Sequence, residues 1–362
     1  MNVIFFQNQF CTRALKQAIA LKSNVANLIG ITASANATST VHQNLINNTF
    51  NKIYNNVSTI NDLSNIVEIE RPEIIHCHNW PDTQAYIAIK ANTNNSYKVI
   101  HDIHDHGTYQ YKKLSAQQNK EENYCEKNAD GYIFVSSLSQ EILSRERNLE
   151  HPSTVVHSMP NRSSFPSNLP TKSNGRLVYQ GGMHSLEGHH RNYIEIFKRI
   201  TKNDFFLDVF TSTVKRNKFN FPLTFRNSGQ KKIFYDYKKI SNKYIKIIKS
   251  TPIEKLYNKL IHYDAGISIL NSNDNPYQQL TLPNKIFEYT MCGLPSIVDS
   301  KCKAIKDYIN KTNLGIIVDD WSKFNHKDLS KSKQFIKNNR YSFCMENEIK
   351  NSLQLYKDIL HG

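Results

Sequence analysis

The sequence predicts an α/β protein made of two doubly wound domains, and three observations lead to this expectation. The chain has 362 residues, a length that suggests two domains of ordinary size. Short apolar runs alternate with helical patterns along the whole chain, as they do in a parallel sheet with crossover helices. One stretch rich in proline, serine and asparagine, residues 160–175, interrupts this alternation and predicts a linker.

The first half contains six expected strands, each a short apolar run of the kind buried in a parallel sheet. Leu15, Ala18 and Ile19 stand at helical spacing and predict a helix between the first two strands. The expected strands are Val3–Phe6, Leu28–Thr32, Glu73–His76, Val99–Ile103, Tyr132–Val135 and Thr154–Val156.

The second half repeats this pattern. Tyr193, Ile196 and Ile200 lie on one face of an expected helix, and residues 251–254 form a capping box that opens another. The six expected strands are Leu177–Gln180, Phe206–Phe210, Tyr244–Ile248, Ala265–Leu270, Ser296–Val298 and Leu314–Val318.

The domain boundaries follow from the linker and from the end of the chain. We expect an N-terminal domain over residues 1–165, a C-terminal domain over residues 166–340 and a last helix within 341–362. That helix carries Ile349 and Tyr356 on one apolar face, so it needs a surface to pack against.

Charge is the main peculiarity of the composition. The formal net charge is +15, and residues 215–249 hold many lysines and arginines but a single acid, Asp236. Such a segment can bind anionic lipid, nucleic acid or an acidic polymer. The same charge can equally come from lysines on every exposed face that bind no partner. Composition alone does not distinguish these two explanations.

The cysteines and the apolar runs indicate a cytoplasmic protein. Six cysteines stand at scattered positions without paired or metal-type spacing, which fits reduced thiols. No run approaches the roughly 18 apolar residues of a membrane span. The first residues lack the basic region of a signal peptide, so we expect them to form a strand.

One stretch, residues 282–298, predicts the most specific chemistry. Pro283 suits the first turn of a helix, and Gly293 with Pro295 suits its end. The free N–H groups and positive dipole end of that helix favour an anion. Lys285 and Glu288 share one face with Asn284, so a phosphate at the helix tip and a ribose on the acid would suit a nucleotide.

Residues 283–297, Pro-Asn-Lys-Ile-Phe-Glu-Tyr-x-x-x-Gly-Leu-Pro-Ser-Ile, resemble the nucleotide-sugar signature of two-domain (GT-B) glycosyltransferases, especially the retaining family 4 type. The resemblance implies two Rossmann-like domains facing each other across a cleft, with the C-terminal helix crossing back to the first domain. It also implies that Glu288 holds the ribose of the donor and belongs to the catalytic group.

Three polar clusters follow expected strands of the first domain and resemble segments of the same family. His76-Cys77-His78-Asn79 places His78 and Asn79 on the acceptor side, together with Asn8 and Gln9 of the first loop. A strand ending in His-Asp gives catalytic roles to His104 and Asp105, the histidine lying near the reacting sugar carbon. A third segment, residues 129–137, contains Asp130, which we expect to be structural.

The expected diphosphate site departs from the family pattern. Gly181 and Gly182 permit close approach of the backbone, but Met183 and Glu187 stand where relatives carry basic residues. The residues that could replace that charge are His184, His189, His190, Arg191 and Lys285.

A second departure lies before the 282–298 stretch. Leu280 replaces an acid that relatives use for the sugar, so residues 275–279, with Tyr277, are the expected sugar-facing loop or a plain connection. The donor-binding residues expected overall are Gly181, Gly182, Arg191, Tyr277, Asn284, Lys285 and Glu288.

The resemblance therefore implies a glycosyltransferase that moves a sugar from a nucleoside-diphosphate sugar, its co-substrate, to a saccharide or lipid-linked acceptor. It implies retention, no metal and no further cofactor, although histidines and aspartates at the strand ends could form a metal site. Surface polysaccharide or glycoconjugate synthesis at an anionic membrane surface is the expected setting. Nucleic acid is not an expected partner. A non-catalytic basic binding module and a sugar-nucleotide 2-epimerase remain alternatives.

Overall fold

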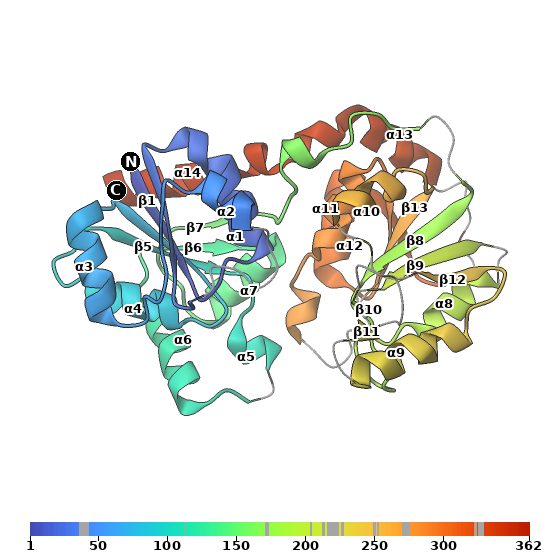
Figure 1. Cartoon of the computed structure of the whole chain (residues 1–362), viewed down its shortest axis with the longest axis horizontal. Coiled ribbons are helices and arrows are strands. Elements are labelled where there is room, and N and C mark those ends of the chain that lie inside the picture. Colours follow the sequence, from blue (N-terminus) through green and yellow to red (C-terminus); the bar gives the residue numbers. More distant parts are fainter. Residues whose placement is uncertain are drawn as a thin grey trace. The chain divides into compact units, whose positions relative to one another are not determined.

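The structure is a computed structural model, and the chain in it divides into two compact units (Figure 1). Unit 1 comprises Met1–Arg162, Leu280–Leu282 and Cys344–Gly362, and unit 2 comprises Ser163–Gln279 and Pro283–Phe343. The division after Arg162 lies three residues before the expected boundary. The described residues are 1–35, 43–111, 113–170, 174–202, 205–211, 214–215, 224–225, 228–248, 251, 253–269, 276–321, 324 and 329–362.

Unit 1 is built on a parallel sheet of seven strands, in the order β3-β2-β1-β4-β5-β6-β7. The order reverses between β1 and β4, and in open sheets of this kind ligands bind outside the carboxyl ends of the strands at such a point. The strands are β1 (Asn2–Gln7), β2 (Asn27–Thr32), β3 (Lys52–Tyr54), β4 (Ile74–His78), β5 (Lys98–Ile103), β6 (Gly131–Phe134) and β7 (Ser153–Val155).

The helices of unit 1 connect these strands, and several begin with side-chain caps. Thr59 and Asp62 form a capping box at α3, and Ser115 with Gln118 forms one at α6. The helices are α1 (Thr12–Leu21), α2 (Gln43–Thr49), α3 (Ile60–Glu70), α4 (Thr83–Ala91), α5 (Gly107–Gln110), α6 (Ala116–Asn128), α7 (Ser137–Glu146) and α14 (Met345–His361).

The last helix, α14, belongs to unit 1, as the predicted fold requires. It packs against α1, β6 and β7 and buries Ile349, Leu355 and Tyr356. The hydroxyl of Tyr356 lies 2.5 Å from Nδ1 of His76, which is itself fully buried. This contact ties the end of the chain to the centre of the first sheet.

Unit 2 repeats the architecture with six parallel strands in the order β12-β9-β8-β13-β14-β15. Its order reverses between β8 and β13. The strands are β8 (Arg176–Gly181), β9 (Phe206–Thr211), β12 (Ile245–Ile248), β13 (Ala265–Ser268), β14 (Ser296–Asp299) and β15 (Gly315–Val318), with a separate antiparallel pair β10 (Val214–Lys215) and β11 (Thr224–Phe225).

The helices of unit 2 follow the same alternation. The helix that contains Tyr289, α11, packs closely on β13. A Cβ atom at Gly266 of β13 would lie 2.2–2.4 Å from the ring of Tyr289, so only glycine at this position lets α11 approach the sheet. The helices are α8 (Ile194–Thr201), α9 (Ser228–Lys239), α10 (Ile253–Leu260), α11 (Asn284–Met291), α12 (Lys303–Thr312) and α13 (Leu329–Asn339).

Every predicted strand overlaps an observed parallel strand, and the predicted fold class is confirmed. Strand β3 was not predicted, because Lys52–Tyr54 is a three-residue edge strand without an apolar run. The hairpin β10–β11 was missed for the same reason. Leu270 and Pro252, from a predicted strand and the predicted capping box, lie outside the described residues. Within the described part of the chain, no helix combines the length and apolarity needed to cross a membrane.

Candidate active site

Unit 2 contains a pocket of about 320 Å³ at the carboxyl ends of β8 and β9. These strand ends lie beside the point where the strand order reverses, which is the expected place for a ligand. The first turns of α11 form the opposite wall. The lining residues are Gln180, Gly181, Phe210, Thr211, Thr251, Leu256, Asn284, Lys285 and Glu288.

Helix α11 is fixed against the sheet by its own side chains. Pro283 is the N-cap residue in an extended conformation, one position before the helical turn predicted for it. Gly293, with φ of 78°, ends the helix in the left-handed region that favours glycine. The Tyr289 hydroxyl accepts the N–H of Gln180 at 3.1 Å and donates to the carbonyl of Ile267 at 3.3 Å. The second turn of α11 is therefore held against β8 and β13.

Glu288 points its carboxylate at two donors within unit 2. Gln180 Nε2 donates to Oε2 at 2.6 Å, and the Tyr257 hydroxyl donates to Oε1 at 3.4 Å. An ionised carboxylate can accept about four hydrogen bonds, so capacity remains for a ligand's hydroxyl groups. Gln180 and Tyr257 were not among the predicted site residues, although Gln180 directly precedes the predicted Gly181.

Lys285 lies at the other end of the same helix face. Its Nζ atom is 4.2 Å from the centre of the Tyr179 ring and 3.4 Å from the place where a Cβ atom of Gly181 would stand. Burial and, to a smaller extent, the nearby charge of Arg191 lower the pKa of Lys285 to about 7, against an opposing effect of Glu288. An anion bound beside Gly181 would favour the charged ammonium.

The loop after β8 carries a stack of three imidazole rings. The ring centres of His184 and His189 are 3.9 Å apart, and those of His189 and His190 are 4.3 Å apart. Nδ1 of His184 accepts the N–H of Leu186, and Nδ1 of His189 accepts the N–H of Arg191, each at 3.0 Å. Both rings therefore carry their proton on Nε2 when neutral.

These histidines were expected to help replace the missing basic residues, and two of them could do so only as neutral donors. Burial lowers the pKa of His189, and His184 and Arg191 lower it further. Burial, His189 and Arg191 together lower the pKa of His190 to about 4. Neither ring is charged near pH 7, so among the described residues of the β8 loop and α11 the basic side chains are Arg191 and Lys285.

The predicted donor residues are only partly brought together. Gly181, Asn284, Lys285 and Glu288 line the pocket. Gly182 follows in the loop, where its carbonyl accepts the Tyr179 hydroxyl at 2.8 Å, and Arg191 is exposed on that loop. Tyr277 is 3% exposed, packed into unit 2 rather than among the residues that line this pocket. Asn275, from the same predicted loop, lies outside the described residues.

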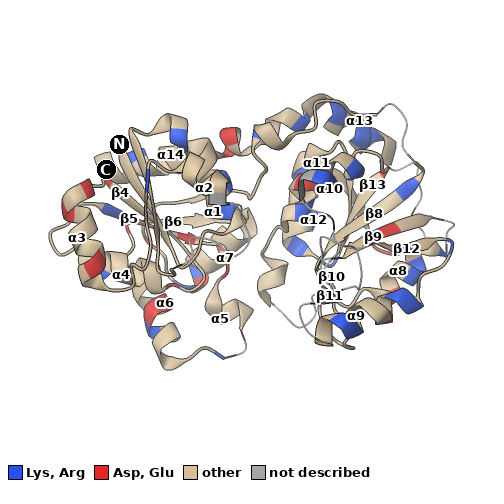
Figure 2. Cartoon of the chain, viewed as in Figure 1, with Lys and Arg blue, Asp and Glu red and all other residues tan. Residues whose placement is uncertain are grey.

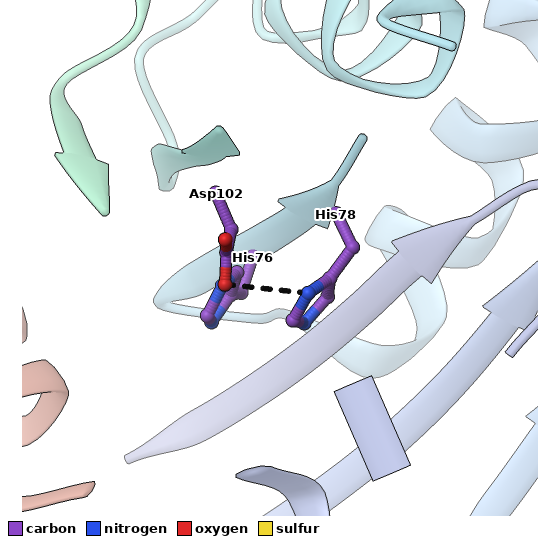
Figure 3. A group of neighbouring side chains, drawn as sticks. All are labelled: His76, His78 and Asp102. Carbon is purple, nitrogen blue, oxygen red and sulfur yellow. Dashed lines mark ion pairs between the residues drawn. The ribbon is translucent and has the colours of Figure 1, made fainter. Parts of the chain in front are cut away.

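In unit 1, a buried polar cluster surrounds Asp102 at the carboxyl ends of β4 and β5 (Figure 3). Nε2 of His76 and Nδ1 of His78 each lie 3.4 Å from Oδ2 of Asp102. Arg13 Nε lies 3.1 and 3.2 Å from the two carboxylate oxygens, and Gln17 Nε2 donates to Oδ2 at 2.8 Å. Burial alone would raise the pKa of Asp102, but Arg13 and the histidines hold it well below its usual range. This carboxylate was not a predicted site residue.

The predicted catalytic pair follows β5 in a loop that Asn79 holds in place. Asn79 Nδ2 donates to the carbonyl of Asp105 at 2.9 Å, and its Oδ1 accepts the N–H groups of His104 and Asp105 at 2.9 and 3.1 Å. These hydrogen bonds use both the nitrogen and the oxygen of the Asn79 amide. Asn79 therefore orients the loop rather than offering that amide to an acceptor saccharide. The side chain of Asp105 is 43% exposed.

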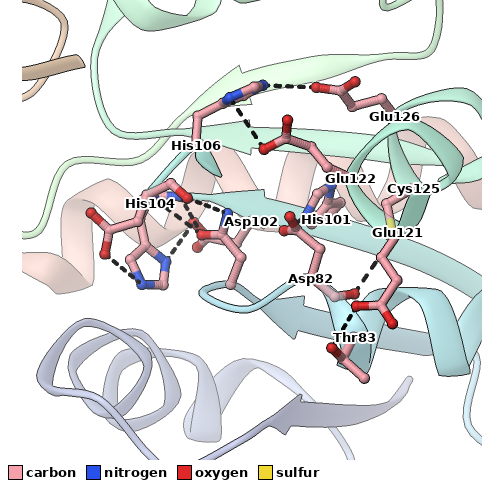
Figure 4. A network of polar contacts seen from close by, with 12 residues as sticks. Asp82, Thr83, His101, Asp102, His104, His106, Glu121, Glu122, Cys125 and Glu126 are labelled. Atoms are coloured by element: carbon pink, nitrogen blue, oxygen red, sulfur yellow. Dashed lines mark hydrogen bonds and ion pairs between the residues drawn. The ribbon is translucent and has the colours of Figure 1, made fainter. Parts of the chain in front are cut away.

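His104 is the charged imidazole of this cluster (Figure 4). Its Nδ1 lies 3.8 Å from Oδ1 of Asp102, and its Nε2 lies 3.9 Å from Oδ2 of Asp105. Burial would lower the pKa of His104, but its interactions with Asp102 and Cys11 raise it to about 10. His78, by contrast, is 2% exposed, and neither of its ring nitrogens has a hydrogen-bond partner.

Other predicted residues have simpler surroundings. Asn8 is exposed and its side chain accepts the Ser34 hydroxyl at 2.9 Å, while Gln9 is half-buried. Asp130 accepts the Val99 N–H at 2.8 Å and pairs with Lys98 at 3.0 Å, bonds that suit the structural role expected of it.

Two groups in unit 1 place three side-chain ligand atoms close enough for a metal ion. In the Asp102 group the carboxylate already pairs with Arg13. In the second, His106 lies beside Glu122 and Glu126 (Figure 4). The carboxylate of Glu126 also pairs with Arg147 at 2.7 Å. A guanidinium beside the carboxylate opposes a cation, so we assign neither group to a metal. The prediction of a metal-free site stays a prediction.

Comparison with known proteins places this arrangement in context. The family model described as Glycosyltransferase Family 4 matches residues 32–159. Among solved structures, sucrose-phosphate synthase from Thermosynechococcus elongatus is similar at 12% identity with a TM-score of 0.62, over 99% of this chain and 96% of that one. Anabaena HepE in complex with UDP-glucose is similar at 11% identity with a TM-score of 0.60, over 99% and 98%. No curated protein matches the sequence.

A further similar structure is UDP-GlcNAc 2-epimerase from Methanocaldococcus jannaschii, at 12% identity with a TM-score of 0.53, over 99% and 100% of the two chains. Identities this low speak for the fold alone. They confirm the predicted GT-B fold, and the family model confirms the predicted resemblance to family 4. The 282–298 stretch lies outside the matched residues, so its site stays assigned by its own geometry.

Proposed function

We propose that this chain, which has the GT-B fold and whose residues 32–159 match glycosyltransferase family 4, moves a sugar from a nucleotide-sugar donor to a saccharide or lipid-linked saccharide acceptor. The observation that carries the proposal is the pocket of unit 2. It brings a carboxylate, a lysine and a glycine turn to the carboxyl ends of β8 and β9.

The donor nucleoside diphosphate fits this pocket by its chemistry. The ribose hydroxyls donate to Glu288, whose carboxylate is held in place by Gln180 and Tyr257. The diphosphate lies beside Gly181, where no side chain bars it, and meets the ammonium of Lys285. The free N–H groups at the start of α11 add a favourable dipole end for the same anion.

The reaction needs negative charge on the departing diphosphate to be stabilised as the sugar leaves. Fixed N–H donors and cations supply such stabilisation, typically several kcal/mol. Among the described residues of α11 and the β8 loop, Lys285 and Arg191 supply cations, with the neutral imidazoles of His189 and His190 as further donors. We assign His104 and Asp105 to the donor sugar, and metal-independent retention to the reaction, as the resemblance implies.

The positive charge of unit 2 supports a lipid-linked acceptor at a membrane surface. Lysines and arginines gather on the described helices α8 and α9 of unit 2 (Figure 2), so an anionic membrane surface bearing a lipid-linked acceptor suits this face. Several basic residues of the 215–249 segment, among them Arg216 and Arg226, lie outside the described residues. Binding to anionic vesicles that is lost at high salt, with no binding to neutral vesicles, would support this assignment.

A thermal-shift panel tests the donor assignment. UDP, GDP, ADP, CMP and their sugars are added one at a time, and a selective ligand at about 100 times its Kd should stabilise the fold by about 2.7 kcal/mol. We expect one base to raise the melting temperature by several degrees. If no nucleoside diphosphate stabilises the protein selectively, the proposal fails and a non-catalytic basic module becomes the better reading.

A sugar-nucleotide 2-epimerase is the alternative that shares the fold. Incubation with the stabilising nucleotide sugar alone separates the two activities. A transferase leaves the sugar configuration at C2 unchanged and needs an acceptor for turnover. Appearance of the 2-epimer without any acceptor would favour the epimerase.

A further inference from the structure

Two aromatic side chains lie together just beyond the neighbouring strands β4 and β5 of unit 1. Trp80 comes two residues after β4, and Tyr111 follows the short helix α5, which comes after β5. Their ring centres are 5.3 Å apart, with 33° between the ring planes. Trp80 is half-buried and Tyr111 is 41% exposed, so both residues keep part of their surface open to a ligand. We call this pair the aromatic platform.

Close packing on Gly107 holds the aromatic platform from behind. A Cβ atom at Gly107 would lie 2.6 Å from Cζ3 and 2.9 Å from Cη2 of Trp80, so the indole rests where no side chain fits. The carbonyl of Gly107 also accepts the N–H of Tyr111 at 2.9 Å. One residue therefore contacts the first ring and positions the backbone of the second.

A buried cluster of acids and a histidine anchors this segment. His106 directly precedes Gly107, and its Nε2 and Nδ1 lie 2.8 Å from Glu126 and 3.4 Å from Glu122 (Figure 4). The N–H of Thr108 donates to Glu122 at 3.0 Å. The proposed sugar transfer gives these buried groups no role. They hold α5 in place, and a ligand surface on a rigid segment binds without an ordering cost.

A carboxylate lies in the adjoining loop. The carbonyl of Asp105 accepts Nδ2 of Asn79 at 2.9 Å, and Asn79 directly precedes Trp80. The side chain of Asp105 is 43% exposed, whereas that of its neighbour His104 is 15% exposed. A ligand at this loop therefore meets the acid more readily than the histidine.

The Tyr111 hydroxyl adds a donor at the edge of the aromatic platform. It accepts a hydrogen bond from Nε2 of Gln110 at 3.4 Å and keeps its own proton to donate. Burial and, to a smaller extent, the charge of Asp105 raise the pKa of Tyr111, so this hydroxyl is neutral near pH 7.

This surface has the chemistry that an uncharged pyranose needs. The C–H face of a pyranose packs on aromatic rings, and its hydroxyl groups exchange hydrogen bonds with a carboxylate and a phenol. An axial hydroxyl on that face would hold the sugar away from the rings. Nucleic acid bases also stack on aromatic side chains, but the exposed carboxylate of Asp105 would repel their phosphates. The same repulsion disfavours an acidic sugar.

We propose that the aromatic platform binds an uncharged pyranose with equatorial hydroxyl groups, and that Trp80 and Tyr111 thereby select the acceptor. Saccharide binding stands on the geometry of unit 1. Its role as recognition of the acceptor rests on the proposed function.

Tryptophan fluorescence tests this inference on the full chain without any donor. The chain has two tryptophans, and the second, Trp321, is 5% exposed in unit 2. Trp321→Phe therefore leaves Trp80 as the sole tryptophan. Cellohexaose and N-acetylchitohexaose share the equatorial pattern, so each should change the emission saturably. Hyaluronan hexasaccharide, which adds carboxylates to similar rings, and oligothymidine should bind more weakly.

Variants in the same background identify the rings involved. Tyr111→Ala should weaken cellohexaose binding about tenfold, the scale of one lost stacking contact, and Tyr111→Phe should retain most of the affinity. Tyr235→Ala, at an exposed tyrosine of α9, is the matched control and should change nothing. Melting curves check that each variant is folded. If Trp321→Phe does not fold, calorimetric titration of the wild type and of Tyr111→Ala gives the same comparison.

Three results would overturn the inference: no saturable binding of either neutral hexasaccharide, tighter binding of hyaluronan or oligothymidine, or wild-type affinity in Tyr111→Ala. The outcome is separate from that of the donor assignment. A protein that binds cellohexaose but no nucleoside diphosphate would keep the aromatic platform and lose the proposed function. A protein that binds a nucleoside diphosphate but neither neutral hexasaccharide would lose this inference alone.

Discussion

At the residue scale, the pocket of unit 2 contains a lysine, Lys285, whose burial disfavours its charged form. The pKa of Lys285, about 7, lies below that of a lysine in the unfolded chain, about 10.4. Between these values the unfolded state binds more protons, so the stability of the protein rises with pH. The free-energy cost of holding charged Lys285 in the folded protein is complete below about pH 7 and disappears toward about pH 10.4.

We therefore expect Lys285→Met to raise the melting temperature of the ligand-free protein by several degrees at pH 6 and by much less near pH 10. The same substitution should abolish stabilisation by the nucleoside diphosphate, because the diphosphate loses its cation. Lys198→Met, at an exposed lysine of α8, is the matched control and should change neither quantity. Equal melting temperatures of wild type and Lys285→Met at pH 6 would contradict this account.

The residues also differ in how far the sequence could predict them. Gly181, Asn284, Lys285 and Glu288 belong to motifs with a physical reason for their spacing, and the structure brings them to one pocket. Gln180 and Asp102 gain their places only when strands far apart in sequence pair, so no local pattern points to them. Tyr277 was predicted to bind the donor because residues 275–279 precede the 282–298 stretch. That position in the chain does not determine where the ring of Tyr277 packs.

At the element scale, the position of helix α11 depends on its close approach to β13. The ring of Tyr289 covers Gly266, where a Cβ atom would meet ring atoms at 2.2–2.4 Å. Those atoms belong to a side chain held by hydrogen bonds to β8 and β13, so they cannot move aside freely.

Gly266→Ala should therefore displace α11 at Tyr289, with a cost of about 1–3 kcal/mol for the overpacked contact. We expect the melting temperature to fall and the affinity for the nucleotide to drop together. Ser268→Ala, in the same strand, removes a buried hydroxyl that has no hydrogen-bond partner and should be nearly neutral. Undiminished nucleotide affinity in Gly266→Ala would show that α11 does not depend on this close approach.

The elements of the fold were predictable to a large extent, for a physical reason. Strands buried on both faces contain apolar runs, and such runs make β1, β4 and β14 predictable from the sequence. Edge strands such as β3 need no such run and escape prediction. The order of strands within each sheet comes from pairing between distant segments, which the resemblance implied but no local pattern encodes.

At the scale of the whole molecule, each unit has its own parallel sheet, and α14 returns to complete unit 1. Tyr356 of α14 is fully buried and bonds Nδ1 of His76. The pocket of unit 2 is lined by residues of unit 2 alone. Stability of the first unit and nucleotide binding by the second should therefore respond to different substitutions.

Tyr356→Ala should cost about 3–5 kcal/mol, the range for a large buried ring, and leave His76 without its partner. The melting temperature should fall while the Kd for the nucleotide, titrated at a temperature where the variant is folded, stays within about twofold. Gln354→Ala, on the exposed side of the same helix, should change neither. A large loss of nucleotide affinity in Tyr356→Ala would contradict this separation.

We propose that a carboxylate of α11 holds the nucleoside of an activated sugar, and the Glu288→Gln variant tests this role. The substitution keeps the shape of the side chain and removes its charge, and Glu195→Gln on α8 is the matched control at an exposed acid. Titration with the nucleoside diphosphate that stabilises the wild type should show binding at least about tenfold weaker in Glu288→Gln, the scale of a lost charged hydrogen bond, and unchanged in Glu195→Gln. Wild-type affinity in a folded Glu288→Gln protein would contradict the account.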